Sequence, residues 1–435
     1  MKKIIGILIC TLLIATAFSA VGQINKITIN KKNNTNPSNN DEKWAKTFGD
    51  EKYNMGVSVK QTSDNGYIIL GDTGDFYESN MDFWLIKTDS NGNKIWEKTY
   101  GGEKQDWPTS LDITNEGGYI MIGRTHSFDA GKGDIWLIKT DSNGNKIWDK
   151  TFGGTDYDAG YDVKQTTDDG FILIGHTSSF SDSRDIWLIK TDSDGNKIWD
   201  KTFGGSEKDG GYSVQQTTDG GYILLAETNT IETKQDIFLI KTDSNGEMQW
   251  NKIFAEPDYD YAGSVEQTSD GGYIIISSIY KGVTFEDICL IKTDSNGDII
   301  WDKTFPTIGD NMGREVHQTT DGGYIILGDI FDGSRVDLLL IKTDGTGQEV
   351  WSKTYGWKYT DVGHSIQQTT DGGYIITGEF SPGRFKDPDL WLIKTDENGD
   401  APNNLGRSII NYRLFEIFPN ISRILKNILD LLVII

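Results

Sequence analysis

Two short motifs recur along this chain, and the two series are offset at the ends. Ile-Lys-Thr-Asp occurs seven times, with its Ile at positions 86, 138, 189, 240, 291, 341 and 393. Trp-x-Lys-x-aromatic also occurs seven times, with its Trp at positions 44, 96, 148, 199, 250, 301 and 351. A period of 50 to 52 residues indicates a supersecondary unit that stacks on copies of itself. The first Trp has no Ile-Lys-Thr-Asp before it and the last Ile-Lys-Thr-Asp has no Trp after it, which predicts a ring closed by the N-terminal segment.

One unit is predicted to contain four short strands joined by hairpins. In the unit that begins at Tyr212, the expected strands are 213–217, 222–225, 237–241 and 248–254. Asp219-Gly-Gly and Asp243-Ser-Asn-Gly supply tight turns, and residues 227–235 are expected to form a variable loop. Middle strands such as 135–138 are apolar at both odd and even positions, so neighbouring sheets should cover both of their faces.

These patterns predict a single all-β domain over residues 41–399, a seven-bladed β-propeller with four-stranded antiparallel blades. The short, polar first strands are expected to line a central channel, and the alternating, charged fourth strands to form the outer edge. Trp44 to Phe48 would complete the last blade and close the ring. Deletion of residues 40–49 is therefore predicted to unravel the whole domain.

The two ends of the chain differ in composition from the repeats. Residues 1–22 carry two lysines, an apolar run and small residues, as a secretory signal peptide does, although an uncleaved membrane span remains an alternative. Residues 23–40 resemble a flexible linker. Residues 400–435 are a polar link and an apolar tail, open to interpretation as an anchor, a sorting tail or a docked helix, with membrane or envelope association favoured. The sequence thus predicts a secreted or cell-surface monomer.

Charge and cysteine content narrow the class of partner. The 435 residues carry a formal net charge of −23, which disfavours binding to nucleic acid. Cys10 lies in the predicted signal segment, so Cys289 would be the one cysteine of the processed chain, and it is expected to be a buried thiol.

The repeats also resemble a known group of proteins. Leu-Ile-Lys-Thr-Asp-Ser-Asn-Gly-Asn-Lys-Ile-Trp (137–148) and Thr-Asp-Gly-Gly-Tyr-Ile (218–223) resemble the repeats of secreted and surface β-propeller proteins of bacteria and archaea. More distantly, the strand that ends in Trp is similar to the Trp-docking repeat of quinoprotein dehydrogenases. The likeness covers residues 41–399 and implies a propeller, but propellers host unrelated activities. Seven blades and the absence of vicinal cysteines are atypical of the quinoprotein group.

Two sets of acidic residues are candidate cation ligands. Asp-Ser-Asn-Gly turns partly match a calcium loop but lack its distal carboxylate, so a hairpin turn is the favoured interpretation. A second set occupies one position before each first strand, where it would circle the channel mouth and offer a Ca²⁺ site: Asp106, Asp158, Asp209, Asp260 and Asp361, with Asn54 and Asn311. Turn capping by each residue is the competing interpretation.

Aromatic residues in the loops that share this face are the candidate ligand-binding residues: Trp107, Tyr157, Tyr212, Tyr259, Trp357 and Tyr359. Catalytic motifs are not evident, and His126 and His176 are expected to be solvated residues at the start of variable loops. The sequence therefore favours a non-enzymatic scaffold that binds protein or carbohydrate partners. The alternative is a polysaccharide lyase or hydrolase, with carboxylates paired across the channel, or a quinoprotein-like dehydrogenase.

Overall fold

The computed structural model describes residues 43–49, 52–75, 80–128, 131–180, 183–229, 234–254, 259–280, 286–306, 309–331, 334–356, 359–383 and 386–402. Within these ranges every regular element is a β-strand, and no helix there could cross a membrane. The predicted signal peptide, the linker, the tail from residue 403 onward and Trp357 lie outside them.

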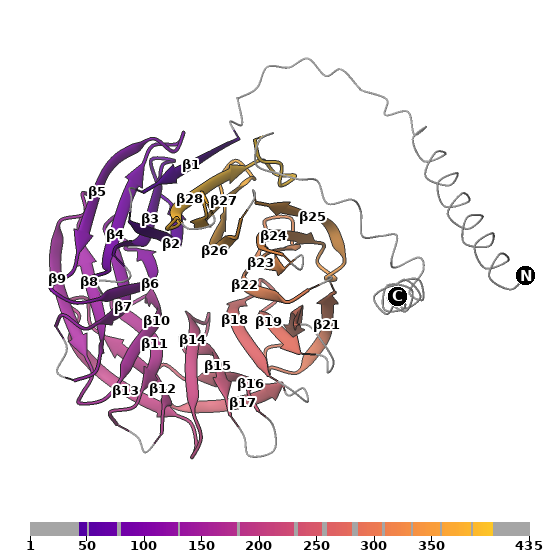
Figure 1. The fold of residues 1–435 in the computed structure, drawn as a ribbon. Coiled ribbons are helices and arrows are strands. Elements are labelled where there is room, and N and C mark those ends of the chain that lie inside the picture. The colour runs from indigo at the N-terminus through magenta and orange to yellow at the C-terminus, as the bar shows by residue number, and fades with distance from the viewer. Residues whose placement is uncertain are drawn as a thin grey trace, which may run out of the picture. The chain divides into compact units, whose positions relative to one another are not determined.

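The strands form seven antiparallel four-stranded sheets arranged in a ring (Figure 1). The first strands are β2 (Tyr53–Gln61), β6 (Asp106–Ile113), β10 (Asp158–Gln165), β14 (Asp209–Gln216), β18 (Asp260–Gln267), β22 (Asn311–Gln318) and β26 (Asp361–Gln368). The second strands are β3 (Tyr67–Gly74), β7 (Tyr119–Thr125), β11 (Phe171–Thr177), β15 (Tyr222–Thr228), β19 (Tyr273–Tyr280), β23 (Tyr324–Phe331) and β27 (Tyr374–Phe380).

The third strands are β4 (Asp82–Thr88), β8 (Asp134–Thr140), β12 (Asp185–Thr191), β16 (Asp236–Thr242), β20 (Glu286–Thr293), β24 (Val336–Thr343) and β28 (Asp389–Thr395). The fourth strands are β5 (Lys94–Tyr100), β9 (Lys146–Phe152), β13 (Lys197–Phe203), β17 (Met248–Phe254), β21 (Ile299–Phe305), β25 (Glu349–Tyr355) and, for the last blade, β1 (Trp44–Phe48). β1 pairs with β28 from Trp44 opposite Lys394 to Phe48 opposite Leu390. The seven-bladed fold and its closure by the N-terminal strand are thus confirmed.

The hydrophobic cores lie between adjacent blades, as the apolar middle strands require. One core combines Ile122 of β7 and Leu137 of β8 with Leu173 of β11 and Ile189 of β12 from the next blade. Because each middle strand contributes to a core on both faces, no blade can bury its apolar side chains alone. Cys289 of β20 belongs to one of these cores, as predicted.

The repeated Trp and Gly residues meet across every blade boundary. Gly195 in the hairpin after β12 has φ of +75°, and a Cβ added to it would lie 2.7 Å from the ring of Trp148 in the preceding blade. Only glycine combines this backbone conformation with so close an aromatic neighbour. The seven pairs are Trp44–Gly92, Trp96–Gly144, Trp148–Gly195, Trp199–Gly246, Trp250–Gly297, Trp301–Gly347 and Trp351–Gly399.

The Lys of each Ile-Lys-Thr-Asp motif forms a second invariant contact. Lys241 is nearly buried and pairs with Asp219 of the Asp-Gly-Gly turn at 2.8 Å. The equivalent pairs are Lys87–Asp64, Lys139–Glu116, Lys190–Asp168, Lys292–Asp270, Lys342–Asp321 and Lys394–Asp371. The Asp of the same motif caps the next hairpin: Asp141 Oδ1 accepts the N–H groups of Asn143 and Asn145, both at 2.8 Å. These contacts support the hairpin interpretation of the Asp-Ser-Asn-Gly turns.

Two boundaries differ from the prediction in a way that matters for the site. β15 continues to Thr228, so Glu227 lies in a strand and not in the expected variable loop. Likewise His176 lies inside β11 and is 3% exposed, so the expectation of a solvated loop histidine was wrong. The polar ends of the second strands looked like loop sequence, but the adjacent blade covers them and offers backbone N–H donors.

Candidate binding site at the channel mouth

One second-strand position varies among the blades, with five residue types in seven blades, and carries mostly ionisable side chains. Its occupants are Asp72, Arg124, His176, Glu227, Ser278, Asp329 and Glu379. In three blades the side chain accepts an N–H from the next blade: Glu227 from Ala262 at 2.9 Å, Ser278 from Gly313 at 2.9 Å, and Asp329 from Gly363 at 3.2 Å. In these three blades the side chain at this position therefore reaches the following blade.

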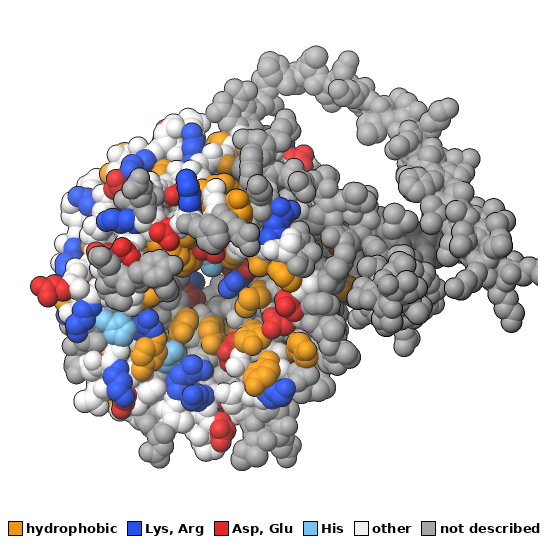
Figure 2. All heavy atoms as spheres, viewed as in Figure 1, with side chains coloured by type: hydrophobic (Ala, Val, Ile, Leu, Met, Phe, Trp, Pro, Cys, Tyr) orange, Lys and Arg blue, Asp and Glu red, His pale blue; other side chains and the backbone are white. Residues whose placement is uncertain are grey.

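The first strands surround a central cavity of about 450 Å³. A register shift, such as that between Gly160 and Asp162, inserts one bulged residue near the start of each first strand. The bulged residues line the cavity and vary from blade to blade: Val57, Thr109, Tyr161, Tyr212, Gly263, Arg314 and His364. Figure 2 shows a hollow in the middle of this face, around which hydrophobic and charged side chains gather with histidine.

Arg124 is a largely buried cation held between aromatic rings. Its guanidinium lies 4.9 Å from the centroid of Tyr157 and 5.8 Å from that of Trp107. Burial lowers its pKa, which the nearby Tyr161 partly opposes. Within the described ranges no carboxylate forms a salt bridge with Arg124, and its Nε has no hydrogen-bond partner there. A desolvated guanidinium without an anion is costly and favours binding of one.

His176 lies next to this arginine and is uncharged. Its ring stacks on Tyr157 with centroids 5.5 Å apart and an interplanar angle of 20°, and it contacts Tyr161 at 5.5 Å. Burial, and then the positive charges of Arg184 and Arg124, lower its pKa to about 3. Its buried Nε2 has no hydrogen-bond partner within the described ranges. The imidazole is therefore neutral at physiological pH and keeps an unused polar atom.

Two tyrosines continue the cluster along the cavity wall. Tyr161 and Tyr212 contact each other with centroids 5.0 Å apart. Burial raises the pKa of both hydroxyls, and the neighbouring Glu227 raises that of Tyr212 further. Arg184 lies beside Tyr212, and its Nε donates to the backbone oxygen of Asp209 at 3.1 Å. We name Trp107, Arg124, Tyr157, Tyr161, His176, Arg184, Tyr212 and Glu227 the mouth cluster.

A more acidic group lies in the last and first blades. The Tyr53 hydroxyl donates to Glu379 at 3.3 Å. Burial raises the pKa of the nearby Asp72 to about 8, and the charge of Glu379 adds to the effect. No hydrogen bond of normal geometry within the described ranges reaches either carboxylate oxygen of Asp72; the nearby N–H groups of Met55 and Asp72 only partly lower its pKa. The next blade carries Pro108 where other blades offer an N–H, and proline has none.

The structure brings together three of the six aromatic residues predicted to bind ligands. Trp107, Tyr157 and Tyr212 belong to the mouth cluster. Tyr259 lies outside it, 46% exposed, with the Lys234 ammonium 4.9 Å from its ring. Tyr359 is partly exposed and is not part of the cluster, and Trp357 lies outside the described residues.

The five aspartates proposed as a calcium site share one position in their blades. Each is the first residue of its strand and is almost fully buried. Asp106 accepts hydrogen bonds from the side chains of Thr125 and Ser127, and Asp158 from Ser179 and the N–H of Gly154. Within the described ranges, no three His, Cys, Asp or Glu side chains are grouped so as to hold a metal ion. The arrangement supports turn capping, and calcium stays an untested prediction.

Sequence reasoning missed Arg124 and Arg184, and it placed His176 in a solvated loop. A signal was present, because Gly71-Asp-Thr, Gly123-Arg-Thr and Gly175-His-Thr share two residues and differ at the middle one. That middle position is the one from which Glu227, Ser278 and Asp329 reach the next blade at the mouth. A repeat that keeps its flanking residues while changing one polar residue marks a site where the fold is constant and the chemistry is not.

Comparisons with known proteins place the fold but not the activity. No protein-family model matches the sequence, and no curated protein matches it significantly. Solved structures do match. A polysaccharide lyase, PL25 ulvan lyase bound to -[GlcA(1-4)Rha3S]-, is 12% identical over 85% of this chain and 99% of its own, with a TM-score of 0.53.

Two further structural matches have other activities. A puromycin hydrolase is 10% identical over 83% of this chain and 57% of its own, with a TM-score of 0.51. The Penicillium chrysogenum α-L-arabinanase complexed with arabinobiose is 11% identical over 82% of this chain and 98% of its own, with a TM-score of 0.45. The two matches with TM-scores above 0.5 support the β-propeller fold, and at these identities they do not distinguish a binding scaffold from an enzyme.

Proposed function

We propose that this protein is an extracellular or cell-surface propeller that binds acidic carbohydrate at the mouth cluster. One observation carries the proposal: the Arg124 guanidinium lies between Tyr157 and Trp107 with no carboxylate partner in the described part of the chain. A planar guanidinium binds a carboxylate or sulfate through two parallel hydrogen bonds. The adjacent aromatic rings offer apolar faces against which a sugar ring can stack.

The net charge of −23 does not conflict with an anionic ligand. Surface charges more than about 8 Å away are largely screened at physiological ionic strength. The mouth cluster itself contains two cations, Arg124 and Arg184, and one carboxylic acid, Glu227, whose pKa burial raises. The local field is therefore positive, and binding should weaken as salt concentration rises.

The test is calorimetric titration of the full chain with cellobiouronate, a glucuronate–glucose disaccharide, and with neutral cellobiose. Cellobiouronate should bind more tightly, and Arg124→Gln should weaken its binding by roughly 10- to 100-fold, the effect of losing one charge-assisted contact. Lys146→Gln is the matched control, because it removes one positive charge from the outer strand β9. Equal affinities for the two sugars, or an Arg124→Gln variant that binds normally, would disprove the proposal.

A second candidate function is lyase chemistry at the same site, favoured by the neutral His176 and the buried Tyr161 beside Arg124. Arg124 would pair with the uronate carboxylate, and a neutral base would take the proton from the carbon that bears this carboxylate. The C–O bond at the next carbon would break, its oxygen would gain a proton, and a double bond would form in the uronate. Ultraviolet absorbance of that unsaturated uronate, lost in His176→Phe or Tyr161→Phe, would support an enzyme; its absence across acidic polysaccharides would support binding alone.

A further inference from the structure

A ring of small polar side chains lines the channel one residue beyond the bulges. Its members are Ser58, Ser110, Asp162, Ser213, Ser264, Glu315 and Ser365, one from each first strand. The bulge allows two successive residues, such as Tyr161 and Asp162, to face the same cavity. The serine ring, as we call it, thus continues directly from the tyrosines of the mouth cluster.

In three serines of the ring the hydroxyl oxygen accepts a hydrogen bond, but within the described residues the hydroxyl hydrogen is not donated. Ser213 accepts the N–H of Val265 at 3.3 Å, Ser264 that of Val316 at 2.9 Å, and Ser365 that of Val59 at 3.3 Å. A hydroxyl can accept and donate at once. In the part of the chain that the structure describes, no acceptor takes the hydrogen of these three hydroxyls, so they are free to donate into the cavity they line.

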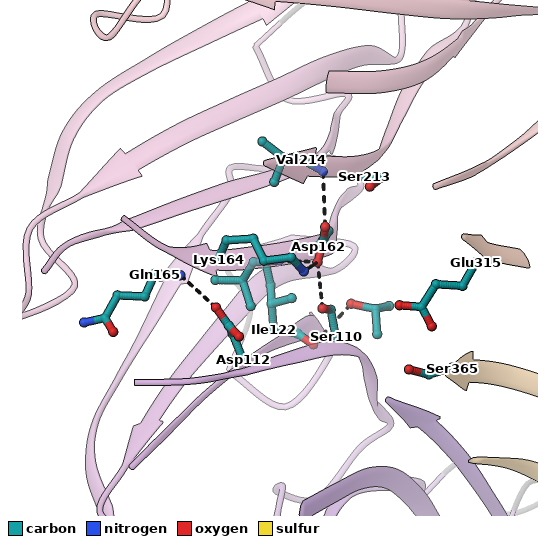
Figure 3. Close-up of polar contacts among 12 residues, drawn as sticks. Ser110, Asp112, Ile122, Asp162, Lys164, Gln165, Ser213, Val214, Glu315 and Ser365 are labelled. Carbon is teal, nitrogen blue, oxygen red and sulfur yellow. Dashed lines mark hydrogen bonds and ion pairs between the residues drawn. The ribbon is translucent and has the colours of Figure 1, made fainter. Parts of the chain in front are cut away.

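Two carboxylates replace serine in this ring and keep its backbone contact. Asp162 accepts the N–H of Val214 at 3.1 Å and the Ser110 hydroxyl at 2.7 Å, and pairs with Lys164 at 2.6 Å (Figure 3). In Figure 3 Ser213, Glu315 and Ser365 lie on the other strands that enclose the same space. Asp162 thus presents an acceptor to the cavity whose charge is balanced by a neighbour.

Glu315 is balanced in the same way from the opposite side of the ring. One oxygen accepts the N–H of Ile366 at 2.6 Å, and the other pairs with His317 Nε2 at 3.0 Å, while His317 Nδ1 contacts Glu266 at 2.7 Å. Burial alone would lower the pKa of His317, but Glu315 and Glu266 together raise it to about 9, so the imidazole of His317 is protonated. The lining therefore combines hydroxyl donors with charge-balanced acceptors.

We propose that the serine ring binds a neutral sugar residue, joined to the acidic residue held at the mouth cluster. This inference rests on the proposed function and names its ligand as a glycan in which acidic and neutral sugars are adjacent. A sugar hydroxyl can accept from serine and donate to a carboxylate, so it matches a lining that offers both. The volume of about 450 Å³ lies within the range of small-molecule sites.

The charge of the lining favours neither a small anion nor a small cation as the occupant. Four carboxylates, Asp112, Asp162, Glu266 and Glu315, face four cations, Lys60, Lys164, Arg314 and protonated His317, which leaves a formal charge of about zero. An anion would therefore gain no net attraction, and no metal-binding group of side chains occurs within the described ranges. A neutral polyhydroxyl compound needs no net charge in the lining.

The experiment compares D-glucuronate, cellobiouronate, cellobiose and inorganic sulfate by calorimetry on the full chain. In the unmodified protein, cellobiouronate should bind at least about 10-fold more tightly than glucuronate, as one or two extra hydrogen bonds imply. In Glu315→Gln and Ser264→Ala this advantage should fall below about 3-fold, with glucuronate affinity unchanged. Glu315→Gln keeps an acceptor for the Ile366 N–H, so it carries the test if Ser264→Ala does not fold.

The possible failures can be told apart. If glucuronate binds but the neutral residue adds nothing, or if the advantage survives in both variants, the channel assignment is wrong and the mouth proposal stands. Sulfate binding that is lost in the same two variants would make the ring an anion site and would also overturn the inference. If neither uronate binds the unmodified protein, the proposed function itself fails.

Discussion

The two ends of the second strand make opposite use of the same repeat. At the hairpin end, all seven blades place a buried lysine against an acidic turn and a tryptophan against a glycine of the next blade. At the mouth end of the second strand, by contrast, one position varies among the blades. It holds Asp72 in the first blade and Glu379 in the last. The comparison teaches that the repeated residues build the ring and the unrepeated ones carry the chemistry.

The two ends also differ in how completely polar groups are paired. Lys241 at the hairpin end pairs with Asp219 and donates to the backbone oxygen of Thr242 at 2.8 Å. At the mouth, Arg124 Nε, His176 Nε2 and the Asp72 carboxylate have no hydrogen-bond partner of normal geometry in the described part of the chain. Natural proteins keep such costly groups mainly where they serve a ligand.

The largest expected effect is on closure. Deletion of residues 40–49 removes β1, leaves β28 with an unpaired edge and takes Trp44 away from Gly92. The shortened chain should lose cooperative unfolding and become aggregation-prone and protease-sensitive. Calorimetry, light scattering and limited proteolysis measure these properties, and a monomeric, protease-resistant deletion variant would contradict the closure mechanism.

The second largest effect should distinguish the buried ion pair at the hairpin end from an ion pair at the surface. Asp219→Ala leaves the nearly buried Lys241 without its anion and should lower the free energy of unfolding by about 1–3 kcal/mol. Asp156→Ala is the control, because its pair with Lys132 is solvated and should be worth less than ~1 kcal/mol. Urea denaturation measures both, and equal losses would show that the buried pair has no special role.

The same aspartate gives a pH dependence with a defined sign. Burial opposes its ionisation, but Lys241 and Thr217 lower its pKa to about 2. Its contribution to stability is therefore complete above the ordinary pKa of about 4 and is lost as the pH falls toward 2. In Asp219→Ala this acid-induced loss should be smaller than in the unmodified chain, as thermal melts across that pH window would measure.

Asp72 at the mouth should show the opposite sign. Because its pKa is raised to about 8, the unfolded chain ionises it before the folded chain does, so stability falls as pH rises from about 4 to 8. Asp72→Asn should stabilise the protein by roughly 2–4 kcal/mol at pH 8 and by little at pH 4. Pro108→Ala, which restores an N–H, should also reduce the pH dependence, and identical pH profiles for all three proteins would refute this explanation.

The sequence was sufficient for the ring because each scaffold contact repeats seven times. The offset between Trp44 and the last Ile-Lys-Thr-Asp predicted blade number and closure, since each Trp must meet a turn in the next blade. The site was harder to predict, because the contacts of its polar residues form only when the blades pack together. The sequence around His176 is typical of a loop, and only the packing of the blades brings this side chain beside Tyr157 and Arg124. The aspartates of the predicted calcium ring, by contrast, share one position and are used within their own blades.

One paired measurement tests the division between scaffold and site most directly. Cellobiouronate affinity and thermal stability are measured side by side for Arg124→Gln and Asp219→Ala. The two variants should show opposite effects. Arg124→Gln should lose binding without a fall in its melting temperature, whereas Asp219→Ala should lose stability and, while folded, keep its affinity. An Arg124→Gln variant that binds normally, or a folded Asp219→Ala variant that does not bind, would contradict the assignment of function to the mouth.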